Sequence, residues 1–190
     1  KQFTGRGEFS LIFGNFDVQM TVPADHVIAA TGECQNYAQV LTPEQLKRWN
    51  AVQKLSAADV AAANGAMDPT EIVTLDEAKF REQHRDTLQT KTWHYKATNV
   101  RDFAWGSSRK FVWDAMPEFV EGKRINCMSY YAKEAYGLYR KYSTKVVAHT
   151  IKTYSKYSTA YQYPVAISVE ASSGMEYPMI CFNYGSTDED

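Results

Sequence analysis

The sequence predicts an α+β fold that is rich in strands and carries one long helix. Three patterns support this prediction. Apolar and polar residues alternate over residues 16–22, which is the period-two signature of a strand with one buried face. Short segments with helix-start signals follow between residues 42 and 90. A third segment, about 133–157, repeats apolar and aromatic residues at helical spacing.

Composition excludes several classes of protein. The 190 residues are 44% hydrophobic and 14% aromatic, which excludes a disordered chain. The formal net charge of −1 gives no electrostatic footprint for nucleic acid or an anionic membrane. No apolar run approaches the roughly 18 residues that a membrane-spanning helix needs. The composition therefore predicts a globular protein with a packed core.

The first hundred residues predict strands interrupted by helices. We expect strands over residues 8–13, 16–23 and 27–33, with a turn at Pro23-Ala24-Asp25 between the last two. Capping boxes at Thr42, with Pro43 after it, and at Thr74 predict two helices, and Ser56 begins a third that Gly65 ends. Residues 71–75 read as a short strand. The segment 42–90 is thus predicted to be a helical insertion between strands, without chemistry of its own.

An aromatic strand over residues 92–105 is predicted to run into a turn at Gly106-Ser107-Ser108. Within it, Arg101 and Asp102 could contact a substrate or form a buried pair that fixes the strand, and we favour the buried pair, because such pairs commonly set structure.

Beyond residue 106 we expect strands at 111–114, 125–131 and 161–169, the first two joined through Glu121-Gly122-Lys123. The long helix lies between the last two strands. Its two apolar stripes are predicted to pack rather than to bind a cofactor; they are Tyr139, Tyr142 and Val146, and then Val147, Ile151 and Tyr154.

The segment 169–180 is the candidate functional loop. Glu176 stands between a Ser172-Ser173-Gly174 turn and an apolar run, with Pro178 two residues on. Glycine lets a backbone approach a ligand closely, and an extended run can pair with a peptide as an added strand. A carboxylate at the end of such a groove would meet the free amine of the peptide. The pattern predicts a site for the amino end of a peptide.

Gly174-Met175-Glu176-Tyr177-Pro178 resembles the Gly-x-Met-Glu-Asn exopeptidase loop of the aminopeptidase N type gluzincins, and in particular a bacterial subgroup in which Tyr-Pro replaces Asn. Ser173 stands where the family has its first glycine. The following residues 179–185 resemble the next strand of the family, and the Thr31-Gly32-Glu33 and Asn99–Trp105 segments resemble its N-terminal domain. The resemblance implies that Gly174, Met175, Glu176 and Tyr177 bind substrate.

The resemblance also implies a division of the chain. Residues 1–105 would be the end of a saddle-like β-rich N-terminal domain, and residues 106–190 would be the first, mixed sheet and long helix of a thermolysin-like catalytic domain. The zinc ligands of the family lie on a His-Glu-x-x-His helix. This chain has no such motif; its histidines are His26, His84, His94 and His149. We therefore expect a fragment that ends before the zinc helix, without a metal site or catalytic residues of its own.

The functional hypothesis is a fragment of a zinc-dependent aminopeptidase that supplies the amine-binding loop, takes peptides as partners and is inactive alone. The alternatives are a non-catalytic peptide- or protein-binding β-rich module and a purely structural domain. A sheet separated from its helical half would leave one face bare, so self-association of the fragment is expected.

Overall fold

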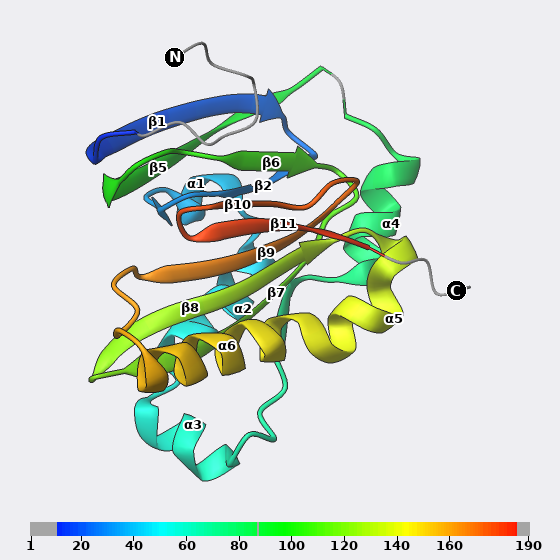
Figure 1. Cartoon of the computed structure of the whole chain (residues 1–190). Helices are drawn as coiled ribbons and strands as arrows, with labels where there is room; N and C mark the ends of the chain where they lie inside the picture. The colour runs from blue at the N-terminus through cyan, green and yellow to red at the C-terminus, as the bar shows by residue number, and fades with distance from the viewer. Residues whose placement is uncertain (1–10, 87, 186–190) are drawn as a thin grey trace.

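The computed structural model describes residues 11–86 and 88–185. Three sheets follow one another across the molecule, and the long helix covers one face of the largest (Figure 1). The fold is α+β with a mixed sheet and one long helix, so the predicted fold class is confirmed. Within the described ranges no helix is long and apolar enough to cross a membrane.

The first sheet is antiparallel, with the order β1 (Gly14–Pro23), β5 (Thr90–Val100) and β3 (Glu33–Cys34). Its first strand shows the predicted alternation, because Met20 and Val22 are buried and Gln19 and Thr21 are exposed. Of the strand predicted at 8–13, residues 8–10 lie outside the described residues and residues 11–13 form no strand.

The second sheet corrects the prediction of a turn at residues 106–108. Trp105–Ser108 is strand β6, which pairs with β2 (Val27–Ala30). The chain bends earlier, at residues 101–104. The predicted buried pair is also wrong: Arg101 is exposed and lies over the Phe13 ring, and Asp102 accepts a bond from the Phe103 amide. Arg101 thus lies in solvent, and the Asp102 carboxylate is occupied by a backbone amide next to it in the chain.

Helices α2 (Pro43–Lys54), α3 (Ala57–Ala63) and α4 (Leu75–Gln83) begin where the sequence predicts. Helix α1 (Tyr37–Val40) was not predicted, and it has no side-chain cap. Thr42, Ser56 and Thr74 each accept a bond from the third helical residue, which bonds back to the cap backbone. The short strand predicted in this segment is β4 (Thr70–Val73), which joins the third sheet.

The third sheet has six strands in the order β10-β11-β9-β8-β7-β4. The remaining strands are β7 (Val112–Val120), β8 (Lys123–Tyr131), β9 (Val165–Ala171), β10 (Met175–Tyr177) and β11 (Ile180–Tyr184). β9 is parallel to β8 and to β11, and the other pairs are antiparallel. The predicted turn at Glu121 and Gly122 is present, with φ of 49° and 77°, the left-handed values of a tight hairpin.

The long helix is broken into segments: η1 (Lys133–Ala135), α5 (Tyr136–Leu138), a π-helical turn η2 (Tyr139–Ser143) and α6 (Thr144–Tyr157). Tyr139 packs as predicted. Tyr142, Val146 and Tyr154, however, are 48%, 56% and 68% exposed. The packing prediction is therefore wrong for these three side chains, because η2 and α6 present only one face to the sheet.

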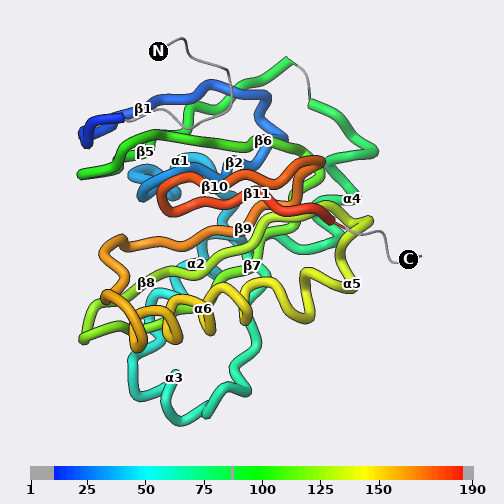
Figure 2. Tube along the Cα trace, viewed as in Figure 1, coloured from blue at the N-terminus to red at the C-terminus, as the bar shows by residue number. Residues whose placement is uncertain are grey.

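The largest buried cluster spans the predicted boundary near residue 106, with Trp93 on one side of it and Trp113 on the other. Strand β4, from the first half of the chain, lies in the sheet of the second half. In Figure 2, β10 and β11 run beside β2 and β6. The division into 1–105 and 106–190 stays a prediction.

Candidate functional site

The candidate loop forms a hairpin at the edge of the six-stranded sheet. Strand β10 pairs with β11 through Met175↔Phe182, Glu176↔Cys181 and Tyr177↔Ile180. Among the described residues no strand pairs with the other side of β10. The backbone N–H and C=O groups on that side have no strand partner among the described residues, and Met175 and Glu176 of this strand are exposed. Unpaired groups of this kind can pair with an added strand.

The Glu176 carboxylate lies free at this edge. The side chain is exposed, and no described residue forms a hydrogen bond or an ion pair with it. A carboxylate without an internal partner has no role in holding the fold together. It is available to a cation from outside the chain.

Gly174 is not required by the packing of the loop. A Cβ added there would lie 3.8 Å from its nearest neighbours, the Phe182 carbonyl oxygen and the Tyr184 ring, which is ordinary van der Waals contact. Gly174 also has no left-handed φ. The internal structure would therefore accept a side chain at this position.

The other two predicted site residues differ in exposure. Met175 is 39% exposed. Tyr177 is half-buried, and its ring meets Phe182 edge to face with the centroids 6.0 Å apart. Tyr177 therefore helps to fix the hairpin on the core as well as lying next to Glu176.

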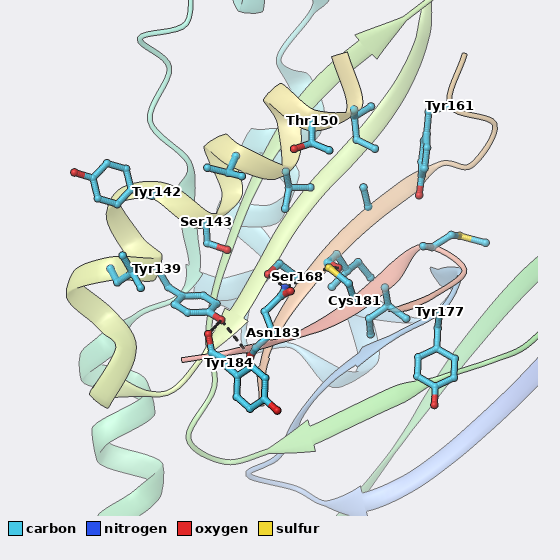
Figure 3. A pocket seen from close by; sticks show the side chains of 18 residues that line it. Tyr139, Tyr142, Ser143, Thr150, Tyr161, Ser168, Tyr177, Cys181, Asn183 and Tyr184 are labelled. Carbon is cyan, nitrogen blue, oxygen red and sulfur yellow. Dashed lines mark hydrogen bonds between the residues drawn. The ribbon is translucent and has the colours of Figure 1, made fainter. Parts of the chain in front are cut away.

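A groove of about 550 Å³ runs between the long helix and strands β9 and β11, and it reaches Tyr177 (Figure 3). Its walls are mostly apolar, with Val146, Val147 and Ile151 on the helix side and Ile167 and Ile180 on the sheet. The sequence did not predict this groove, because periodicity does not show which helix face lacks a cover.

One end of the groove is polar. The Tyr139 hydroxyl donates to the carbonyl oxygens of Asn183 and Tyr184, at 3.4 and 3.1 Å, and burial raises the pKa of Tyr139 to about 12. The Asn183 amide donates to the Ser168 hydroxyl at 2.8 Å. These bonds fix the end of β11, which is the partner strand of the Glu176 segment.

The described residues do not provide a zinc site. No group of three or more His, Cys, Asp or Glu side chains is placed among them to hold a metal ion. The four histidines have other partners: His26 bonds Ser107, His84 bonds the Phe80 carbonyl, His94 bonds Asp17, and His149 bonds Thr153. Imidazole is a normal zinc ligand, but the described histidines are not grouped with other donors in a way that could hold a zinc ion.

Comparison of the sequence finds no matching protein family and no matching curated protein. Comparison of the fold does find matches among solved structures. One is a crystal structure of a two-domain M1 zinc metallopeptidase mutant bound to L-tryptophan, with a TM-score of 0.53 and 11% sequence identity. The alignment covers 93% of this chain. The chain is similar in fold to part of an M1 zinc metallopeptidase.

The chain spans 31% of the length of that metallopeptidase. At this identity the likeness concerns the fold. It supports the coarse gluzincin resemblance of the sequence, and it leaves the roles of Gly174, Met175, Glu176 and Tyr177 as predictions.

One contact of the loop was missed by sequence reasoning. The Thr31 hydroxyl donates to the Pro178 carbonyl oxygen at 3.0 Å, across 147 positions of the chain. No local pattern signals such a contact, because it depends on how the second sheet lies against the third.

Proposed function

We propose that this chain is part of a zinc-dependent aminopeptidase and supplies the surface that binds the amino end of the peptide substrate. Hydrolysis and zinc binding would belong to parts of the protein beyond these residues, so the chain alone is expected to be inactive. The fold similarity to an M1 zinc metallopeptidase supports the peptidase class.

The observation that carries the proposal is the unpaired Glu176 carboxylate on an edge strand. An extended peptide can pair with the open side of β10, and its terminal ammonium would then meet a carboxylate that no described residue neutralises. A charge-assisted bond of this kind contributes on the order of 1.5–3 kcal/mol in a closed site. A blocked amine would lose that contact, which favours removal of N-terminal residues over internal cleavage.

The ligand of the structural neighbour supports the same reading. That metallopeptidase was crystallised with L-tryptophan, an amino acid with a free α-amine. A free amino acid is the product that an aminopeptidase releases. The neighbour thus binds a molecule of the chemical class that the proposal assigns to the Glu176 edge.

The proposal is tested by zinc content and peptidase activity of the full-length protein, with the 190-residue chain as a control. We expect about one zinc per full-length molecule and release of N-terminal residues, both lost when a chelator removes the metal. A folded full-length protein without zinc and without activity would contradict the proposal. That result would favour the alternative, a non-catalytic module that binds a peptide or protein at the same edge.

A further inference from the structure

The turn that ends the Glu176 strand has an unfavourable backbone. Because Tyr177 pairs with Ile180, only Pro178 and Met179 form the hairpin loop. Met179 has a φ of 66°, a left-handed value that non-glycine residues rarely adopt. Proline followed by a residue with positive φ is the pattern of a type II turn, where glycine or asparagine is normal at the second position. Such a turn persists only if its surroundings hold it.

Both loop residues are held from outside the hairpin. The Met179 side chain is 6% exposed within the main core, and the Met179 carbonyl oxygen accepts the Ile167 amide at 2.8 Å. The Pro178 carbonyl oxygen accepts the Thr31 hydroxyl at 3.0 Å. The first two contacts lie within or beside the third sheet. The Thr31 contact is different, because it comes from the segment that links β2 to β3.

Thr31 is itself rigidly placed. It is fully buried, its amide donates to the Ala104 carbonyl oxygen at 2.9 Å, and its hydroxyl accepts the Ala104 amide at 3.1 Å. Since the hydroxyl accepts from Ala104, its single proton is directed at Pro178. The next residue, Gly32, has a φ of 92°, and a Cβ there would lie 2.2 Å from the Lys96 carbonyl oxygen. The backbone conformation next to Thr31 therefore requires glycine at position 32 and is closely packed against Lys96.

We propose that Thr31 is a positioning residue whose hydroxyl clamps the strained Pro178–Met179 turn and so fixes Glu176 at the open edge of the sheet. The clamp is a property of the fold. Its consequence for substrate rests on the proposed function, since Glu176 lies two residues from the clamped carbonyl. A shift of the turn would move the carboxylate relative to the end of a bound peptide.

The clamp is tested first on the 190-residue chain by amide hydrogen exchange. Thr31→Val keeps the shape and removes the hydroxyl, Thr31→Ser restores the hydroxyl, and Thr144→Val is the matched control, because Thr144 is equally buried but its hydroxyl has no partner. We expect exchange of the peptide 175–180 and of the Ile167 amide to rise roughly threefold to tenfold in Thr31→Val only, because the hydrogen bond to Pro178 is lost. The same substitution also removes the acceptor of the Ala104 amide, whose exchange is followed separately. Unchanged exchange in a folded Thr31→Val would overturn the clamp.

If Thr31→Val does not fold, NMR of the wild-type chain tests the Thr31–Pro178 hydrogen bond instead. The clamp predicts a Thr31 hydroxyl proton that exchanges slowly with water and shows contacts to the 178–179 turn. A hydroxyl proton in rapid exchange would overturn it.

The consequence for substrate is tested in the full-length enzyme by a double-mutant cycle with Glu176→Gln. If Thr31 acts through Glu176, Thr31→Val lowers kcat/KM for a free-amine substrate by about tenfold to a hundredfold in the wild type, and much less in the Glu176→Gln background. Thr31→Ser should restore the rate. Equal losses in both backgrounds would contradict the positioning role. A full-length protein without peptidase activity would refute the proposed function, while the exchange result on the clamp would stand.

Discussion

At the residue scale, the Glu176 carboxylate lies in water at the edge of a sheet whose inner strands are buried. Exposed ion pairs contribute only about 0–1 kcal/mol, because water competes with the partner and salt screens the charge. The amine contact therefore becomes strong only when further walls close around the peptide. We expect the chain alone to bind peptides weakly even if Glu176 is the amine ligand of the complete enzyme.

The two glycines near the loop give opposite predictions for alanine. Gly174→Ala should leave the melting temperature of the chain unchanged, because the new Cβ meets only ordinary contacts. Gly32→Ala should destabilise the fold by several kcal/mol, because its φ is left-handed and the Cβ would overlap the Lys96 carbonyl. Thermal melting of both variants measures this. A Gly174→Ala melting temperature as low as that of Gly32→Ala would contradict our account of the loop.

In the full-length enzyme Gly174→Ala should still lower kcat/KM, since the side chain would stand where the peptide backbone approaches. Activity equal to that of the wild type would remove Gly174 from the substrate site.

At the element scale, predictions succeeded where the determining contacts are local. The capping boxes at Thr42, Ser56 and Thr74 are formed by residues three positions apart, so the sequence shows them directly. Strand β6 was not predicted, because Gly-Ser-Ser by itself favours a turn. Its partner β2 lies almost 80 positions earlier in the chain, as in the pairing Ala29↔Gly106, so no local pattern shows the strand. A motif pointed to Glu176, whereas the hydrogen bond from Thr31 to Pro178 joins segments 147 positions apart and has no local signature.

Arg140, in the π-helical turn η2 of the long helix, lies beside two carboxylates, one buried (Asp114) and one partly exposed (Glu71). Asp114 on β7 is fully buried and lies opposite Glu71 on β4. Tyr131 donates to Asp114 at 2.6 Å, and Arg140 of the π turn lies 3.9 Å from the same oxygen and bonds Glu71. Glu71 also accepts from Tyr136. The Arg140 guanidinium thus lies within ion-pair distance of both carboxylates. Burial raises the pKa of Asp114 from its ordinary 3.8 to about 7.

This pKa predicts a pH dependence of stability. Between about pH 4 and pH 7 the folded chain holds a proton on Asp114 that the unfolded chain has released, so this carboxyl group lowers the free energy of unfolding as pH rises. Asp114→Asn removes the titration. We expect the free energy of unfolding of the wild type, minus that of Asp114→Asn, to fall as pH rises through this window. Urea unfolding of both proteins at several pH values measures this difference. A difference that is constant or rises with pH would contradict the prediction.

At the scale of the whole molecule, one face of the largest sheet is only partly covered. The groove beside α6 is bordered by large side chains that remain exposed, among them Tyr142 at 48% and Val146 at 56%. An apolar face of this kind favours association, because burial removes it from water at roughly 25 cal/mol per Å².

We therefore predict that the 190-residue chain self-associates through this face, and that light scattering at high concentration gives a mass above 21.6 kDa. Val146→Glu should shift the chain toward monomer, since a charge would be buried in the contact. Gln19→Glu adds the same charge to an exposed position of β1 and should have no effect. A wild-type chain that stays monomeric would contradict the prediction.

Glu176 is proposed to bind the free amine of a peptide, and the kinetics of Glu176→Gln in the full-length protein test this role. We predict that kcat/KM for a substrate with a free N-terminus falls about tenfold to a hundredfold, the equivalent of roughly 1.5–3 kcal/mol. Glu44→Gln, at another exposed position, should have no effect. Cleavage of free-amine substrates by Glu176→Gln at the wild-type rate would contradict the claim.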